Sequence, residues 1–218
     1  MEIQRSYESK RRTNIWLLCL FAICMSSFAI ISIIIAGNQH PAFDEQMYNL
    51  FTGWMGPGGI AVLEVVSALA SKPAIISISI LTIILLWFIK RDYAGMLTMF
   101  LFVLGGNFVN KLVKDWIQRE RPLLDGVVAE GYSFPSGHAM VGLIMYGLIV
   151  YFIHQHSSRP LLKSMVLYAV ILLMMVMGVS RFVLREHYVT DVLAGYSLGG
   201  LMLIMAITVY QRICKSWK

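Results

Sequence analysis

The sequence predicts an all-α integral membrane protein, a bundle of six transmembrane helices with both termini in the cytoplasm. Three observations lead to this fold class. The chain is 58% hydrophobic and 14% charged, whereas about 25% of a typical soluble domain is charged. Six long uncharged apolar runs occur along it, and the segments that join them differ in their basic content. The whole chain, residues 1–218, is expected to form a single membrane-embedded domain.

The six apolar runs define the expected helices. Crossing the ~30 Å hydrocarbon core of a bilayer takes roughly 20 residues. The first run has 22 residues, and the shorter ones must extend into their flanks. An alternative is that one or two short runs form buried core helices. The runs are residues 15–36, 73–89, 93–109, 139–153, 164–180 and 192–210.

The first run is preceded by a polar stretch, residues 1–14, which is expected to be a short cytoplasmic tail. Basic residues followed by an apolar run also occur in signal peptides, but this apolar core is too long and no clear small-x-small cleavage site follows it. A retained first helix is therefore expected. The three cysteines are an odd number without metal-ligand spacing, which argues against a disulfide framework.

Charge predicts the orientation. The first segment, the last segment and two of the loops would lie on one side, and together they hold 11 of the 18 Lys and Arg but 3 of the 12 Asp and Glu, a net charge of +8 against −2 for the remainder. Short basic loops stay in the cytoplasm. The basic composition is thus a topology signal and does not require nucleic acid, for which no basic and aromatic surface is evident. The four segments are residues 1–14, 90–92, 154–163 and 211–218.

The longest stretch outside the runs, residues 37–72, is expected to be an extracytoplasmic loop. Its Gly-Pro-Gly-Gly at 56–59 breaks the chain, and residues 60–70 are predicted to form a short helix lying on the membrane. Glu64 in that helix is interpreted as a solvated interfacial carboxylate. Gly195 and Gly199, at small-xxx-small spacing in the last run, are interpreted as packing residues.

A polar cluster, SRFVLREHYVTD at 180–191, separates the last two runs. Charged residues between membrane segments are costly and tend to mark function. If a helix begins near His187, then His187 and Asp191 lie on one face, and the carboxylate holds one ring nitrogen while the other serves as a nucleophile. Arg181 is a permanent cation that suits a phosphate. The alternative is an interfacial cluster with snorkelling side chains.

A second cluster follows the third run, where Lys114 precedes Arg121 by seven residues. Seven residues are two helical turns, so both side chains are expected on one face, and Pro122 ends the segment. The alternative is a helix end that merely carries basic residues.

The third cluster is FPSGHA at 134–139. Ser136 is a natural N-cap, and the free N–H groups of a helix start favour an anion. His138 is then placed beside that anion as a proton donor or acceptor. Under the predicted topology, all three clusters meet at the extracytoplasmic face.

Together these clusters resemble the ordered three-part signature of the type 2 phosphatidic acid phosphatase superfamily, in its branch of bacterial membrane lipid phosphatases. The resemblance implies that His187 attacks phosphorus, that Asp191 orients it and that His138 protonates the leaving group. It also implies a metal-independent reaction without cofactors. The signature reads Lys114-x6-Arg121-Pro122, Pro135-Ser136-Gly137-His138 and Ser180-Arg181-x5-His187-x3-Asp191, and the implied phosphate-binding groups are Lys114, Arg121, Ser136, Gly137 and Arg181.

The expected function is therefore a lipid phosphate or diphosphate phosphatase in the cell membrane, working at the extracytoplasmic face through a phosphohistidine. Undecaprenyl diphosphate, phosphatidylglycerophosphate and phosphatidic acid are the expected substrates. A phosphotransferase on the same scaffold and a non-catalytic lipid transporter or flippase remain as alternatives. Further charged residues are interpreted as solvated helix ends (Lys111, Arg119 and Arg185) or as the rim of the 123–134 loop (Glu120, Asp125 and Glu130).

Overall fold

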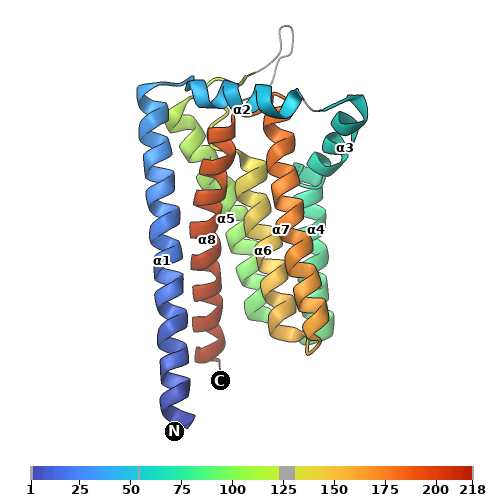
Figure 1. Cartoon of the computed structure of the whole chain (residues 1–218). Coiled ribbons are helices and arrows are strands. Elements are labelled where there is room, and N and C mark those ends of the chain that lie inside the picture. Colours follow the sequence, from blue (N-terminus) through green and yellow to red (C-terminus); the bar gives the residue numbers. More distant parts are fainter. Residues whose placement is uncertain (1, 54, 123–130, 218) are drawn as a thin grey trace.

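The computed structural model describes residues 2–53, 55–122 and 131–217, and within these ranges every regular element is a helix (Figure 1). The elements are α1 (Glu2–Gly37), α2 (Ala42–Thr52), α3 (Pro57–Ala68), α4 (Lys72–Leu85), the π-helical turn η1 (Leu86–Lys90), α5 (Tyr93–Ile117), α6 (Gly137–His156), α7 (Pro160–Val183) and α8 (Val189–Ser216).

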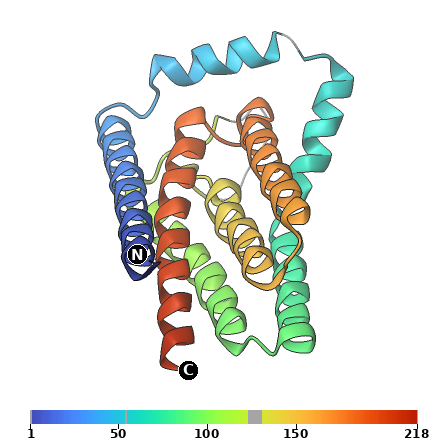
Figure 2. The same cartoon turned by 60° about the horizontal axis from the view of Figure 1, so that its bottom comes forward.

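Helix α6 is the centre of the bundle. It contacts α8 most extensively and also touches α4, α5 and α7, whereas α1 packs mainly against α8. The apolar stretch of α6 is 56% buried and that of α1 is 6% buried. Figures 1 and 2 show α6 enclosed by its neighbours, with α1 on the outside.

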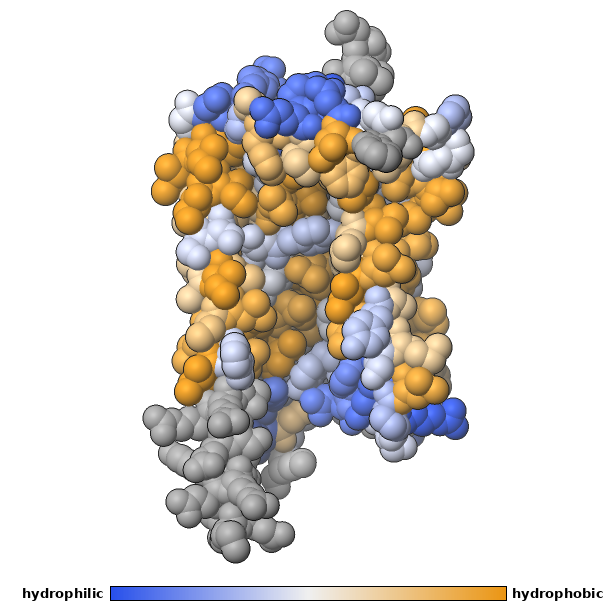
Figure 3. Space-filling model, in the orientation of Figure 1, coloured by the Kyte–Doolittle hydropathy of each residue, from blue (hydrophilic) through white to orange (hydrophobic). Residues whose placement is uncertain are grey.

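The arrangement is that of a membrane protein, as predicted. Among the described residues, five helices (α1, α5, α6, α7 and α8) are long and apolar enough to cross a bilayer. The remaining predicted run, residues 73–89, forms a shorter apolar helix, α4, which lies alongside α5 and α6 (Figure 1). Large apolar side chains cover the outside of the bundle and form an apolar belt between two polar ends (Figure 3). Such a belt matches a bilayer rather than water.

Both termini lie at the same end of the bundle (Figure 1). The helices extend beyond the apolar runs, because a run marks the part exposed to lipid while the backbone hydrogen bonds continue into polar ends. Helix α5 extends eight residues past the predicted end and stops where Gln118 takes a left-handed conformation, φ 54°. Helix α1 already begins at Glu2, so the polar segment that precedes the first apolar run is helical.

The segment between α1 and α4 holds two helices where one was predicted. Helix α3 corresponds to the expected short helix, and its Glu64 is exposed as expected. Helix α2 was not predicted. It crosses the end of the bundle opposite the termini (Figure 2) and packs there through Phe51, whose ring meets that of Phe182 edge-on at 5.1 Å. Acidic residues in its first turn suit the positive end of the helix dipole.

Two glycines fix how α8 meets α6. A Cβ on Gly195 would lie 2.7 Å from the carbonyl oxygen of Ser136, and one on Gly199 would lie 2.7 Å from that of Met140. Both distances are too short for a side chain, so the backbones touch only because these residues are glycine. This contact confirms the packing interpretation and places the start of α6 against α8.

Candidate active site

The three polar clusters of the sequence meet at the end of the bundle that α2 crosses. The end of α5, the start of α6, the end of α7 and the start of α8 all lie there (Figure 1). His138 sits at the centre of this group, close enough to four charged or titratable side chains for their charges to act on it: Lys114, Arg121, Arg181 and His187.

His187 and Asp191 are paired, although not in the way predicted. Helix α8 begins at Val189, so His187 precedes the helix and does not belong to its first turn. The ring still reaches the carboxylate, with Nδ1 3.5 Å from Oδ2 of Asp191. That oxygen also accepts a hydrogen bond of 2.9 Å from the backbone N–H of Tyr188. The helix start thus holds Asp191 beneath the ring and leaves Nε2 pointing away.

The His187 ring is 2% exposed. This burial lowers its pKa from 6.5 to about 4 and outweighs the opposing effect of Asp191. His187 is therefore neutral at pH 7 and has a free lone pair, as a nucleophile requires.

Lys114 and Arg121 lie near one another, but not because they share a helix face. Lys114 is in the last turn of α5, and its ammonium donates a 2.6 Å hydrogen bond to the carbonyl of Tyr132. Arg121 comes after the helix has ended, so the prediction from two helical turns is wrong. Its guanidinium is held by the chain itself, with Nη1 2.9 Å from the Glu186 carbonyl oxygen.

Arg181 is buried at the end of α7. Its guanidinium contacts the hydroxyl of Ser67 on α3 and the carboxylate of Glu186. The Nε atom has no hydrogen-bond partner within the described residues. A phosphate that binds Arg181 therefore finds one free donor and displaces Glu186 from another.

Ser136 is the N-cap residue of α6, as predicted, but its hydroxyl makes no capping bond. Its backbone N–H instead donates a 3.0 Å hydrogen bond to the backbone carbonyl of Asp191. This bond joins the cluster at 134–139 to the cluster at 180–191. Within the part of the chain that the structure describes, the buried Oγ of Ser136 and Nε of Arg181 lack hydrogen-bond partners, and Nδ1 of His187 has only the Asp191 carboxylate, at 3.5 Å. Each unpartnered buried group costs about 1–3 kcal/mol, so the free Ser136 and Arg181 donors indicate a ligand site.

Arg119 is the largest departure from the sequence analysis. It was interpreted as a solvated helix-end charge, yet it is 0% exposed. Its Nη1 lies 2.6 Å from Oδ1 of Asp191, and its Nη2 lies 2.8 Å from Oδ2 of Asp44 on α2. A buried guanidinium is tolerated here because carboxylates neutralise it. Asp44 was missed as well, since nothing in its local sequence indicates a partner 75 residues away.

The other charged residues that were set aside have varied positions. Arg185 is not freely solvated, because it forms hydrogen bonds of 2.9 and 3.0 Å with the carboxylate of Glu45 and lies over the ring of Tyr48. Lys111 and Glu120 are exposed, as expected. Asp125 and Glu130 lie outside the described residues.

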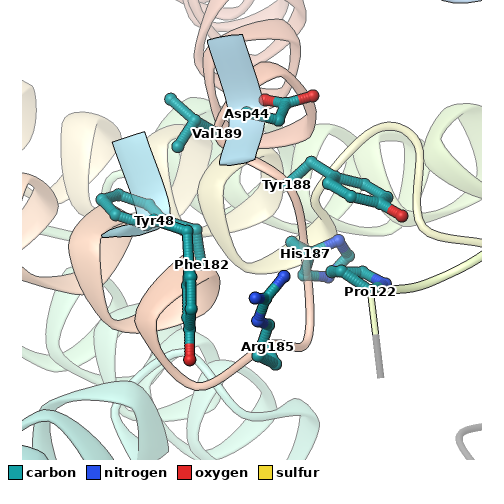
Figure 4. A pocket seen from close by; sticks show the side chains of 8 residues that line it. All are labelled: Asp44, Tyr48, Pro122, Phe182, Arg185, His187, Tyr188 and Val189. Carbon is teal, nitrogen blue, oxygen red and sulfur yellow. The ribbon is translucent and has the colours of Figure 1, made fainter. Parts of the chain in front are cut away.

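A small pocket opens between α2 and the residues that precede α8. His187 forms part of its wall, so the pocket gives access to one side of the ring (Figure 4). In the described ranges, no group of three His, Cys, Asp or Glu residues is arranged to hold a metal ion. The pocket is lined by Asp44, Tyr48, Pro122, Phe182, Arg185, His187, Tyr188 and Val189.

Comparison with known proteins bears on this site directly. The family model of the PAP2 superfamily matches residues 94–214, which include all three clusters. Phosphatidylglycerophosphatase B of Bacillus subtilis (strain 168) is 36% identical over 132 residues, which are 59% of this chain and 64% of that protein. The alignment therefore spans less than two thirds of the length of this relative.

Solved structures resemble the whole bundle. The crystal structure of the first transmembrane PAP2 type phosphatidylglycerolphosphate phosphatase from Bacillus subtilis matches with a TM-score of 0.78 and 28% identity, over 90% of this chain and 96% of that one. Aquifex aeolicus LpxE matches with a TM-score of 0.58 and 17% identity, over 75% of this chain and 93% of that one. The second likeness concerns the fold alone.

Proposed function

The chain belongs to the PAP2 superfamily, and from this premise we propose that it is a membrane lipid phosphatase that works through a phosphohistidine at His187. One observation carries the proposal. A neutral buried histidine, a carboxylate behind it, a second histidine and three cations meet where polar atoms are left without partners. Phosphoryl transfer depends mainly on such positioning and on stabilising negative charge.

The first step forms a bond between Nε2 of His187 and phosphorus and breaks the bond from phosphorus to the leaving oxygen. The ring nitrogen Nδ1 faces Asp191, so Nε2 is the atom available to the substrate. The ring becomes positively charged as it takes the phosphoryl group. The Asp191 carboxylate stabilises that charge.

His138 supplies the proton in this step, which the leaving alkoxide of a monoester or the leaving phosphate of a diphosphate accepts. A water molecule then attacks the phosphohistidine. His138 accepts a proton from this water, the bond between Nε2 of His187 and phosphorus breaks, and inorganic phosphate is released. General acid and base catalysis by one residue in successive steps requires it to lie beside the phosphate. His138 stands in the first turn of α6, next to the free N–H groups of the helix start.

The phosphate oxygens are held by three cationic side chains, at or just after the ends of α5 and α7, and by one helix start. Lys114, Arg121 and Arg181 supply positive charge, and the Ser136 hydroxyl is free to donate. The Gly137 N–H belongs to the positive end of the α6 dipole. Because these groups balance the charge of the phosphate themselves, the reaction is proposed to need no metal ion.

Phosphatidylglycerophosphate is the proposed substrate, because the similar curated protein and the similar solved structure, both from Bacillus subtilis, carry that activity in their names. Undecaprenyl diphosphate and phosphatidic acid present the same terminal phosphate and are the comparison substrates. The site is proposed to face the extracytoplasmic side of the cell membrane. The basic segments at the opposite end of the bundle support this orientation through the positive-inside rule.

The test is phosphate release from the three lipids by purified protein in detergent with EDTA present. We expect turnover by the wild type, fastest with phosphatidylglycerophosphate, and a loss of at least about 1,000-fold in His187→Ala, because no other group forms the covalent intermediate. His154→Ala is the matched control, since that ring lies in the last turn of α6, bonded to Val150.

The outcomes separate the alternatives. Release that survives His187→Ala contradicts the proposed nucleophile. Release that EDTA abolishes contradicts a metal-independent reaction. If labelled phosphate passes to an added alcohol and none is freed, the protein is a phosphotransferase, and if no lipid is turned over at all, it is not a phosphatase of these substrates.

A further inference from the structure

We propose that Asp44 and Arg119 are positioning residues for the reaction, through which helix α2 holds the Asp191 carboxylate against His187. This inference rests on the proposed function of the site. It assigns a role to two residues that none of the three signature motifs specifies, and it makes α2 part of the active site.

The first argument is geometric. The guanidinium of Arg119 bridges two carboxylates, with Nη1 2.6 Å from Oδ1 of Asp191 and Nη2 2.8 Å from Oδ2 of Asp44. The Asp191 carboxylate thus has one oxygen bound to Arg119 and the other directed at the His187 ring. Because Arg119 holds one carboxylate oxygen and the Tyr188 N–H holds the other, the Asp191 carboxylate is fixed at both ends.

The second argument concerns the start of α8, which carries Asp191. Oδ1 of Asp44 accepts a 2.8 Å hydrogen bond from the backbone N–H of Thr190, and Oδ2 accepts one of 2.7 Å from its hydroxyl. Arg119 also donates a 2.7 Å bond to that hydroxyl, and it lies 3.8 Å from the ring centre of Tyr188. Asp44 and Arg119 together therefore hold Tyr188 and Thr190, which lie between His187 and Asp191 in the chain.

The third argument is the charge balance. Arg119 brings one positive charge to two carboxylates whose side chains are 2% and 0% exposed, so this buried group of three side chains carries one net negative charge. The positive charge that His187 gains with the phosphoryl group balances it. Without the charge of Asp44, Arg119 would neutralise Asp191 alone, and the carboxylate would stabilise that intermediate less.

The distinguishing experiment compares Asp44→Asn with Glu45→Gln. The two variants neutralise adjacent carboxylates of α2, one buried on Arg119 and the other half exposed on Arg185. We expect Asp44→Asn to lower kcat for phosphatidylglycerophosphate at least tenfold with KM close to wild type, because Asp44 is bonded to Arg119 and Thr190 and is not one of the proposed phosphate-binding groups. Glu45→Gln is expected to keep kcat within twofold.

Arg119→Lys and the double variant Asp44→Asn/Arg119→Lys complete a double-mutant cycle with Asp44→Asn and the wild type. Lysine keeps the charge without the fork that grips two carboxylates, so kcat is expected to fall in the single variant. The double variant is expected to lose much less than the product of the two single losses, because both act through Asp191.

Three results would overturn the inference: an Asp44→Asn kcat within twofold of wild type, a loss confined to KM, or losses that multiply in the double variant. Turnover by the wild type and by Glu45→Gln tests the phosphatase assignment on its own. If the wild type, Glu45→Gln and Asp44→Asn all turn over lipid normally, the role of Asp44 is wrong and the phosphatase assignment stands. If the wild type is inactive, the phosphatase assignment itself has failed.

Discussion

His187 shows how burial and a single neighbour define the chemistry of one side chain. Its ring is enclosed and touches Asp191 at 3.5 Å, so the loss of water around the ring outweighs the attraction of the carboxylate. The residue identities needed for this were readable from the sequence. The balance between burial and charge was not, because it depends on which residues surround the ring.

The pKa of His187 can be measured directly by NMR on protein with isotope-labelled histidine, with His187→Ala identifying its signal. The expected midpoint is about 4, so the ring stays neutral above that pH. Since Asp191 raises the pKa of His187, Asp191→Asn should move the midpoint lower still. A wild-type midpoint at or above 6.5 would contradict the described burial.

Ser136→Ala tests whether the orphan hydroxyl serves a ligand. Removing a buried hydroxyl without a partner leaves the fold as stable or stabilises it by about 1 kcal/mol, so we expect an unchanged or higher Tm and a KM raised several-fold. Ser180→Ala is the control, because that hydroxyl is equally buried but donates a 2.7 Å bond to Met177. It should lower Tm with little effect on KM. The reverse pattern would mean that Ser136 is structural.

At the scale of elements, the site depends on helix ends more than on helix faces. Helix α5 ends before Arg121, so the predicted two-turn spacing of Lys114 and Arg121 was wrong, and helix α8 begins just after His187, whose ring still faces Asp191. What brings the ends together is the close contact of α6 with α8 at Gly195 and Gly199.

Alanine at these glycines should therefore disturb the bundle. A Cβ at Gly199 meets backbone atoms of Met140, and overpacking of this kind costs about 1–3 kcal/mol, so Gly199→Ala should lower Tm. Gly195→Ala should also lower kcat, because its Cβ presses on Ser136. Gly105→Ala is the control, since its nearest neighbour, Met202, is 4.0 Å away and alanine favours a helix by about 1 kcal/mol. Equal Tm values for Gly105→Ala and Gly199→Ala would refute the packing argument.

At the scale of the whole molecule, the bundle has two unlike ends. One end carries both termini, and the other carries α2, α3 and the candidate site (Figures 1 and 2). The apolar belt between them (Figure 3) fixes the molecule in a bilayer but does not say which end faces the cytoplasm. That choice rests on the basic segments alone.

The orientation can be tested with single cysteines introduced into a cysteine-free variant. Gln46→Cys on α2 and Ser158→Cys between α6 and α7 are both at exposed positions, at opposite ends of the bundle. In sealed right-side-out vesicles, a membrane-impermeant maleimide is expected to label position 46, and position 158 only after detergent is added. Labelling in the opposite order would place the site on the cytoplasmic side.

The sequence by itself determined the membrane class, the helical bundle and the identity of the motif residues. A long apolar run that crosses a bilayer must form a helix to satisfy its backbone hydrogen bonds. Local composition is therefore enough to predict the membrane class and the helical bundle. The tertiary structure decided what lies between distant segments: Asp44 against Arg119, Arg119 against Asp191, and the helix ends that set His187 apart from α8. These contacts join residues more than 70 positions apart, and no local spacing encodes them, because a buried charge is neutralised by whatever partner the fold brings to it.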